Sequence, residues 1–379
     1  MSIQIVPVQN HKDLVKFIKS QWLFYKDDPY FVPPLIADRL KLFDSEKNPF
    51  FKHSEMQEFL AYRNSNIVGR IAAIKNDNHN LTHNDKVGFF GFFESINDQE
   101  VANALFSEVE QWLAKRGLDT IRGPENPSQN DEIGLLIEGF DSPPMVLMEY
   151  NPPYYIDLIK NSGFNLAMTL YAWLLDANNY MTEKLERLQK IVRERYKITI
   201  RTVNFKNKKQ FKKDVDTLKY IYNMAWEKNW GFVKMTDEEF DFLVADLKQV
   251  ADPNLALICE IDGKPAGVAL GIPDINQILI YNKKGSMLGA AWNFMTKSKK
   301  INQMRIIILG VLKEYRNTGA DSVLYYEISK RAIARGITKA EASWVLEINQ
   351  EMNRALQQTI VGTLYKKYGL YEKPILLNQ

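Results

Sequence analysis

The sequence predicts an α/β protein made of two similar halves, each with a mixed, twisted sheet flanked by helices. The first observation is that short runs typical of strands alternate with longer stretches whose apolar residues recur every three or four positions, as in helices. The second is that this alternation occurs twice along the chain, in a similar order. The third is length, because 379 residues at about 150 per domain favour two domains.

Composition indicates an ordinary globular protein and excludes several other classes. Hydrophobic residues make up 45% and charged residues 25% of the chain. The 49 basic and 46 acidic residues leave a net charge of +3, too small to predict nucleic-acid binding from charge alone. No stretch reaches the ~18 uncharged apolar residues of a membrane-spanning helix, and the first residues lack a signal-peptide pattern. We therefore expect a soluble, cytoplasmic protein without a membrane partner.

Residues that commonly bind metals are few. The single cysteine, Cys259, excludes an internal disulfide and a cysteine-rich metal site. The four histidines are scattered along the chain and form no metal-binding motif. No metal cofactor is expected.

The first predicted domain covers residues 1–180. Asn64 and Ser65 mark the turn of a hairpin, and Gly117 and Gly163 mark the ends of helices. The predicted strands are 3–8, 58–63, 66–74, 86–94 and 120–127. The predicted helices lie around 14–18, at 97–116 and at 154–162.

The second predicted domain covers residues 198–379 and is joined to the first by a charged helical linker at 181–197. Asp262 and Gly263 mark the turn of a second hairpin. The predicted strands are 196–203, 255–260, 265–271, 305–311, 339–346 and 368–373. The predicted helices are 208–226, 237–250, 319–334 and 349–358.

The segment 311–321 is the most distinctive local feature, because it connects a very apolar strand to a long helix. It resembles the phosphate-binding loop of the GNAT (N-acetyltransferase) superfamily, whose pattern is Arg/Gln-x-x-Gly-x-Gly/Ala. Arg316 and Gly319 match this pattern, whereas Asp321 stands where Gly or Ala is usual. Free amides and the positive dipole at a helix N-terminus attract phosphate, and glycine lets the backbone approach it. A plain capped strand-to-helix connection is the alternative interpretation.

The resemblance implies a cofactor and the residues that hold it. The co-substrate would be acetyl-coenzyme A or another acyl-coenzyme A. The residues expected to bind it are Val311, Arg316, Asn317, Thr318, Gly319 and Ala320. The corresponding part of the first half, residues 93–98, contains Glu94 and Asp98, so that half is not expected to bind coenzyme A.

Two residues are candidates for catalysis. Residues 364–371 are similar to the Tyr-x-x-x-Gly-Phe segment of the superfamily, and the resemblance implies that Tyr365 protonates the departing thiolate. The two groups have ordinary pKa values of roughly 10 and 8.5, close enough for this exchange. Tyr368 is the second candidate for this role, and plain aromatic packing is the alternative interpretation. Glu347, at the end of strand 339–346, would take a proton from the attacking amine. Its alternative role is to stabilise the N-terminus of the helix that begins at Asn349.

Two other regions are candidates for a functional role. Asn229 and Trp230 follow an aromatic helix end that borders the acceptor pocket in GNAT folds, although an aromatic plug before Gly231 would look the same. The polar loop at 122–132 has the composition of a functional loop. Residues 151–155 are expected to form a rigid turn without a chemical role.

The function predicted from these features is acyl-coenzyme A-dependent N-acyltransfer, most simply N-acetyltransfer, to an amine on a small molecule or peptide. Two similar halves in one chain also resemble N-myristoyltransferases and Fem-type aminoacyl transferases. An aminoacyl-tRNA-dependent transferase is therefore the alternative, in which basic clusters such as 206–213 bind tRNA. A non-catalytic ligand-binding protein on the same fold is the third interpretation.

Overall fold

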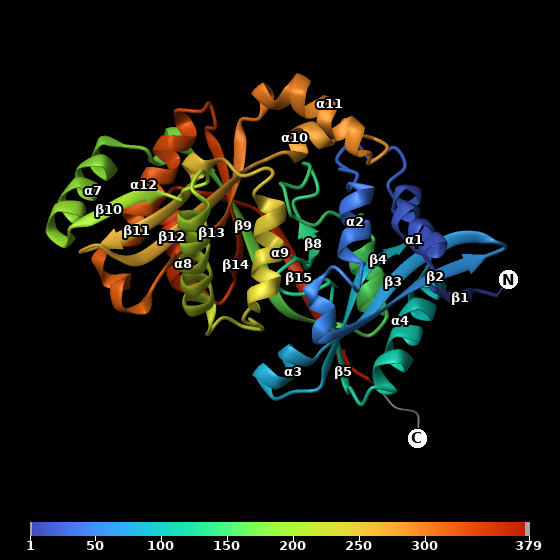
Figure 1. The fold of residues 1–379 in the computed structure, drawn as a ribbon. Coiled ribbons are helices and arrows are strands. Elements are labelled where there is room, and N and C mark those ends of the chain that lie inside the picture. Colours follow the sequence, from blue (N-terminus) through green and yellow to red (C-terminus); the bar gives the residue numbers. More distant parts are fainter. Residues whose placement is uncertain (1, 376–379) are drawn as a thin grey trace. The chain divides into compact units, whose positions relative to one another are not determined.

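The chain forms two compact units in the computed structural model, which describes residues 2–375 except for the side chains of Tyr180 and Lys184 (Figure 1). Unit 1 contains Met1–Leu170, Ile278–Thr296 and Lys366–Gln379. Unit 2 contains Tyr171–Gln277 and Lys297–Tyr365. Neither unit is one continuous stretch of chain.

Unit 1 is built on a mixed sheet. Its neighbouring strands, in spatial order, are β1 (Gln4–Pro7), β2 (Ser54–Arg63), β3 (Asn66–Asn76), β4 (Val87–Ser95), β5 (Thr120–Gly123) and β15 (Thr363–Pro374). Only β4 and β5 pair in parallel in this series. Asn64 and Ser65 have φ values of 49° and 64°, which suit the predicted two-residue hairpin turn. Shorter strands are β6 (Glu125–Asn126), β7 (Glu132–Ile133) and β8 (Leu135–Glu138).

Several helices of unit 1 bury apolar residues, and others do not. The helices are α1 (His11–Phe24), α2 (Ile36–Leu42), α3 (Asp77–His83), α4 (Gln99–Ala114), α5 (Tyr155–Asn161) and α11 (Met287–Lys297), with a short 3-10 turn η1 (Pro49–Lys52). Val101, Leu105 and Phe106 of α4 are buried. A Cβ atom at Gly69 of β3 would lie 2.8 Å from Leu105, so glycine allows α4 to approach the sheet closely.

The strands of unit 2 also pair in a mixed pattern, with the same kind of order. Its strands are β10 (Ile198–Thr202), β11 (Ala256–Ile261), β12 (Lys264–Pro273), β13 (Gln303–Val311) and β14 (Lys339–Leu346), followed by the end of β9 (Asn165–Asp176). Strands β10 to β13 are antiparallel, and β13 pairs with β14 in parallel. The predicted α/β fold, with mixed strand pairing and flanking helices, is therefore confirmed.

The helices of unit 2 include the longest of the described chain, α8, which has the bounds expected from its periodicity. The α-helices are α6 (Ala177–Tyr180), α7 (Glu183–Tyr196), α8 (Lys208–Trp226), α9 (Asp237–Leu247), α10 (Asn276–Leu279), α12 (Ala320–Ile333) and α13 (Gln350–Arg354). Shorter turns are η2 (Pro253–Leu255), η3 (Ser298–Lys300), η4 (Lys313–Thr318) and η5 (Ala355–Thr359). Val323, Leu324 and Ile328 of α12 pack in the core. Within residues 2–375, no helix has both the length and the hydropathy needed to cross a bilayer.

In each unit, the parallel strands separate part of the way along their length. In unit 1 the pairing of β4 with β5 stops at Phe89 and Arg122, although β4 continues to Ser95. In unit 2 the pairing of β13 with β14 stops at Ile306 and Ala342, although both strands continue. Both units therefore contain a splayed pair of parallel strands.

Candidate functional site

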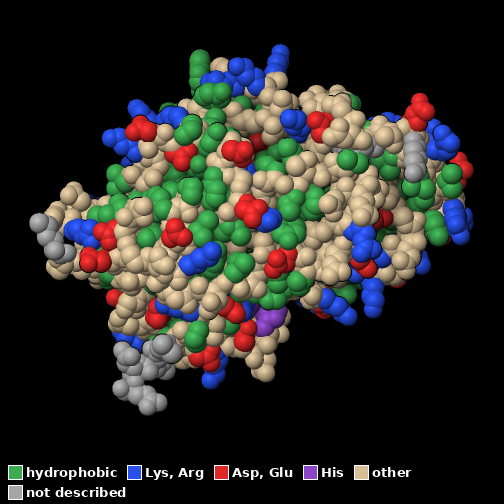
Figure 2. All heavy atoms as spheres, turned by 180° about the vertical axis from the view of Figure 1, so that it is seen from behind, with side chains coloured by type: hydrophobic (Ala, Val, Ile, Leu, Met, Phe, Trp, Pro, Cys, Tyr) green, Lys and Arg blue, Asp and Glu red, His purple; other side chains and the backbone are tan. Residues whose placement is uncertain are grey.

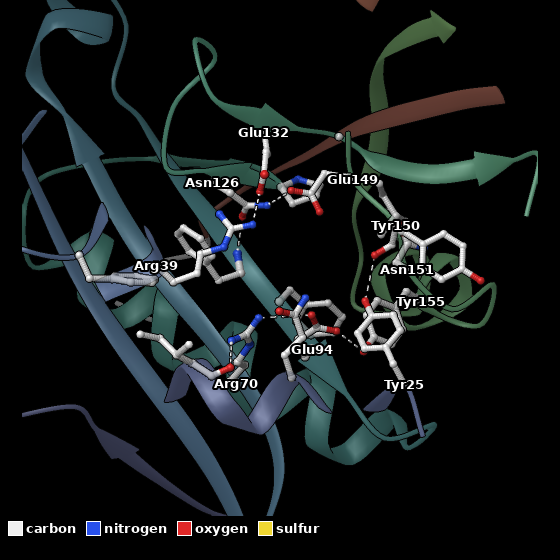
Figure 3. Close-up of a pocket in the computed structure, with 18 residues that line it drawn as sticks. Tyr25, Arg39, Arg70, Glu94, Asn126, Glu132, Glu149, Tyr150, Asn151 and Tyr155 are labelled. Atoms are coloured by element: carbon white, nitrogen blue, oxygen red, sulfur yellow. Dashed lines mark hydrogen bonds and ion pairs between the residues drawn. The ribbon is translucent and has the colours of Figure 1, made fainter. Parts of the chain in front are cut away.

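A polar pocket lies within unit 1 and is lined by side chains of β4 and of the segments around it (Figure 3). Its free volume is about 40 Å³. One water molecule needs roughly 10–15 Å³ of such free volume, so the pocket holds about three waters or one small polar group. Figure 3 shows Glu94 and Arg70 on one side and Glu132, Asn126 and Glu149 on the other.

The first side of the pocket is a buried ion pair. The guanidinium of Arg70 lies 3.3 Å from the carboxylate of Glu94, and Tyr155 donates a hydrogen bond of 2.7 Å to the other oxygen of Glu94. Burial raises the pKa of Glu94, against the opposing effect of Arg70, and lowers the pKa of Arg70. Arg70 also donates to the carbonyl of Phe17 at 2.8 Å. These partners compensate two charges that would otherwise be unfavourable inside the protein.

The opposite side holds two more carboxyl groups. Arg39 forms an ion pair of 2.5 Å with Glu132. Asn126 donates to Glu149 at 2.5 Å and accepts from the backbone N–H of Phe92 at 2.5 Å, so both ends of its amide are engaged. Burial of the Glu149 carboxyl raises its pKa to about 8, with a further contribution from Glu132 and an opposing one from Arg39.

The balance of charge gives the pocket its chemical character. It contains three carboxyl groups, those of Glu94, Glu132 and Glu149, but two guanidinium groups, those of Arg39 and Arg70. Glu149 is the carboxyl whose hydrogen-bond partner is a neutral amide. A carboxyl with a pKa near 8 exchanges protons close to neutral pH, and a cation beside it would favour its ionised form. The pocket thus has one carboxyl group more than it has guanidinium groups.

Close backbone packing places the polar loop beside β4. A Cβ atom at Gly91 would lie 1.8 Å from the carbonyl oxygen of Glu125, so only glycine permits this approach. The contact aligns Asn126 with the N–H of Phe92, which has a φ of 51°. Asn151 fixes another wall of the pocket to β8. Its side chain accepts from the N–H of Leu136 at 2.7 Å and donates to the carbonyl of the same residue.

Part of this pocket lies in segments that stand out in the sequence, and the rest does not. The loop at 122–132 contributes Asn126 and Glu132, and Glu94 was noted only as unfavourable for an anion. Arg39 and Glu149 were missed because nothing in their sequence neighbourhoods marks them. Asn151 was given no chemical role, although it lines the pocket.

The predicted coenzyme A-binding residues lie in unit 2, at the connection between β13 and α12. Val311 ends β13, η4 follows, and Gly319 has a φ of 80° directly before α12. Arg316 is exposed and donates to the carbonyls of Val311 at 3.5 Å and Ala225 at 3.2 Å. Thr318 donates to the carbonyl of Tyr315 at 2.7 Å and accepts from the N–H of Ala320 at 3.3 Å.

The end of α8 packs against the same connection. Ala225, whose carbonyl accepts from Arg316, belongs to the last turn of α8. Asn229 follows in a turn, where its N–H donates to the carbonyl of Trp226 at 2.8 Å. Asn229 and Trp230 are both part-buried. The predicted acceptor residues thus follow a helix end that contacts the predicted cofactor-binding segment.

Tyr365 is held by a buried polar network in unit 2. Its hydroxyl donates to the carboxylate of Glu341, which is fully buried. Ser343 donates to the other oxygen of Glu341 at 2.5 Å and accepts from Arg305 at 2.9 Å. The sequence analysis assigned no role to Glu341, Ser343 or Arg305.

Glu347 lies beyond the end of β14 and is exposed. Asn353 donates to its backbone carbonyl at 3.3 Å. Asn349 caps α13 by accepting from the N–H of Met352 at 3.2 Å. In residues 2–375, no three His, Cys, Asp or Glu side chains are grouped so that they could hold a metal ion.

Comparison with known proteins identifies relatives along the whole chain. No protein-family model matches the sequence. It is 34% identical over 381 aligned positions to the bacterial ceramide synthase of Caulobacter vibrioides (strain NA1000 / CB15N), covering 98% of both chains. It is 35% identical over 374 positions to Protein YghO of Escherichia coli (strain K12), covering 97% of this chain and 94% of that protein.

Solved structures share the fold at low sequence identity. The tandem GNAT protein from the clavulanic acid biosynthesis pathway has a TM-score of 0.60 at 11% identity, with 100% of both chains covered. The GCN5-related N-acetyltransferase from Sphaerobacter thermophilus has a TM-score of 0.55 at 12% identity, covering 100% of this chain and 97% of that one.

Proposed function

Since the chain belongs to the GNAT superfamily, and within it to the family of the bacterial ceramide synthase of Caulobacter vibrioides, we propose that it is an acyl-coenzyme A-dependent N-acyltransferase. The proposed acceptor is the primary amine of a long-chain amino alcohol, because forming a ceramide joins a fatty acyl group to such an amine. The proposed donor is a long-chain acyl-coenzyme A.

The observation that carries this proposal is the connection between β13 and α12. Gly319, with its φ of 80°, brings the chain into the N-terminus of a 14-residue helix, where the helix dipole favours a phosphate group. The hydrogen bonds of Arg316 to two carbonyls are long, 3.2 and 3.5 Å, so turning the exposed guanidinium toward a pyrophosphate costs little. Asp321 is exposed in the first turn, as expected if it points away from the anion.

The proposed reaction forms a C–N bond and breaks a C–S bond. The amine nitrogen attacks the thioester carbonyl, and a backbone amide near Val311 stabilises the oxyanion. The nitrogen loses a proton to Glu347 or to water. The thiolate receives the proton of Tyr365, and the proton released by the nitrogen returns to the Tyr365 oxygen through water. Ser343 and Arg305 keep the Glu341 carboxylate partnered.

The direct test is product formation. Purified protein is incubated with palmitoyl-coenzyme A and sphinganine, and free thiol and N-acyl product are measured by a thiol reagent and mass spectrometry. The proposal requires both to appear in equal amounts. If neither palmitoyl- nor acetyl-coenzyme A yields a product with sphinganine or shorter amines, the proposal fails.

Tyr365→Phe tests the proton donor. Removing the hydroxyl should lower kcat by roughly 10²-fold or more, in the range of general acid catalysis, without changing the Kd for coenzyme A. Tyr220→Phe is the control, because Tyr220 is an exposed tyrosine of the same unit. Unchanged turnover in Tyr365→Phe would remove this residue from the mechanism.

Arg316→Ala tests the donor site. Loss of a charge-assisted hydrogen bond to phosphate should weaken coenzyme A binding about tenfold in calorimetric titration. Arg354→Ala, which removes an exposed arginine from α13, should leave binding unchanged. Equal affinities for wild type and Arg316→Ala would place the pyrophosphate elsewhere.

A second candidate function, binding of an amine without turnover, is favoured by the excess of carboxyl groups in the unit 1 pocket. Ethanolamine is a suitable probe because its size matches the pocket. Glu149→Gln should weaken its binding at least tenfold, whereas Glu46→Gln, at an exposed position, should not. Binding that depends on Glu149, together with no acyl transfer in the product assay, would favour this second function.

A further inference from the structure

Helix α11 exposes its apolar residues instead of burying them. Leu288, Trp292 and Met295 follow the i, i+4, i+7 spacing of one helix face and are 86%, 64% and 72% exposed. Met287 and Phe294 flank this face and are about half exposed, at 50% and 49%. Asn293, on the other side of the helix, is buried. Such a patch on a soluble surface indicates a site of interaction.

The helix is attached to unit 1 by the segment that precedes it, not by its apolar face. The N–H of Ile36 donates to the carbonyl of Gly285 at 3.0 Å, and the indole of Trp22 donates to the carbonyl of Lys283 at 2.7 Å. Asn282 donates to the carbonyl of Ser286 at 2.9 Å, which fixes the turn where the helix begins. These hydrogen bonds hold the segment before the helix and leave its apolar face exposed.

The surrounding sequence is basic. No Asp or Glu occurs between Asp274 and Glu314. Within this stretch, Lys283 and Lys284 stand directly before the apolar face of the helix, and Lys297 is the last residue of the helix. Green hydrophobic and blue basic side chains gather at the upper edge of Figure 2, where α11 lies in Figure 1.

We propose that α11 docks on the surface of an anionic lipid bilayer, with Leu288, Trp292 and Met295 inserted among the acyl chains and the lysines at the headgroups. An apolar face that includes Trp, Phe and Leu, next to lysines, is the pattern of helices that lie in a membrane interface. Lysines near an anionic leaflet add electrostatic attraction, and their long side chains reach the headgroups. Hydropathy along the sequence predicted no membrane partner because it detects spanning segments, and α11 is too short to span.

A second copy of the chain fits this face less well. A symmetric dimer places the same surface of both copies together, so two sets of lysines without carboxylates would meet. The proposal is independent of the proposed enzymatic function, because binding to lipid requires neither acyl-coenzyme A nor an amine substrate.

Vesicle flotation tests the proposal with the intact protein and no substrate. The protein should float with vesicles of phosphatidylcholine and phosphatidylglycerol, much less with phosphatidylcholine alone, and less as salt is raised. The double variant Leu288→Asp/Trp292→Asp should reduce the bound fraction at least tenfold. Leu81→Asp, at a residue 80% exposed on α3, should bind as the wild type does.

Trp292 provides a readout specific to insertion. Lipids with brominated acyl chains should quench part of the tryptophan fluorescence of the wild type, and this part should disappear in Trp292→Phe while flotation persists. Circular dichroism should show an unchanged fold in the double variant, because the side chains of Leu288 and Trp292 face solvent. If the double variant misfolds, Leu288→Ser replaces it in the flotation assay.

Two results would overturn the proposal. The first is flotation that is absent with anionic vesicles or equal in wild type and variant. The second is a dimer in light scattering that dissociates in Leu288→Asp/Trp292→Asp, which would make α11 an interface between copies.

Discussion

Glu149 shows how strongly one carboxyl depends on neighbours that it meets only after folding. In the sequence it is an ordinary glutamate between Met148 and Tyr150. In the folded chain its carboxyl is enclosed, accepts from Asn126 and lies near Glu132, so burial holds its pKa near 8. The proton that it retains is therefore part of the stability of unit 1.

Glu149→Gln should change how stability depends on pH. The folded pKa of about 8 lies above the ordinary value of 4.5, so the native state binds the proton more tightly than the unfolded state. This contribution is complete below about pH 4.5 and is lost as pH rises toward about 8. As pH rises from about 4.5 to about 8, the free energy of unfolding of the wild type should therefore fall relative to that of Glu149→Gln. The fall should be at most about 1.4 kcal/mol per pH unit. Urea titrations at several pH values measure this, and parallel curves for the two proteins would contradict it.

At the scale of elements, the important feature of both units is a parallel strand pair that separates. In unit 1, the part of β4 beyond its pairing with β5 carries Glu94 into the pocket. In unit 2, β13 runs beyond its pairing with β14 and ends at the connection that carries Arg316. In each case, strands that stop pairing leave backbone and side chains available for other contacts.

Gly91→Ala should destabilise unit 1, because the new Cβ atom would lie 1.8 Å from the carbonyl oxygen of Glu125 and the backbone would have to move. The expected loss is about 1–3 kcal/mol in the free energy of unfolding. Gly336→Ala is the comparison, because a Cβ atom there would meet nothing within 4 Å. Only the φ of 80° at Gly336 opposes alanine, and it should lower the free energy of unfolding by about 1 kcal/mol. Urea denaturation of both variants measures the difference. Equal losses would show that the contact with Glu125 does not matter.

At the scale of the whole molecule, each unit is assembled from segments that are distant in the sequence. Unit 1 takes residues 278–296 and 366–379 from the second half of the chain. Strands β9 and β15 each have residues in both units. A donor that binds to one unit should therefore protect segments of that unit whatever their position in the sequence.

Hydrogen exchange with and without palmitoyl-coenzyme A should locate the donor site. Binding raises the free energy of local opening in the unit that holds the ligand. Exchange should slow in η4 and in the first turn of α12, whereas α4 of unit 1 should be unaffected. Slower exchange in β4 and α4 alone would assign the donor to unit 1 instead.

The sequence alone determined the features that depend on neighbouring residues. Hydrophobic periodicity identified α8 and β14 with their bounds, and the predicted coenzyme A-binding residues could be proposed because 311–320 is one continuous segment. It did not identify β9, whose mixed pattern of burial resembles neither a regular amphipathic strand nor a helix.

Only the tertiary structure decided the features that join distant residues. The unit 1 pocket combines Arg39, Glu94, Asn126 and Glu149 from four separate segments, and no local pattern records that they meet. The assembly of unit 1 from three stretches of chain likewise joins residues that are distant in the sequence. The physical reason is that secondary structure follows from local hydrogen bonding and apolar spacing, whereas burial, pKa values and outward-facing surfaces such as α11 follow from which segments pack together.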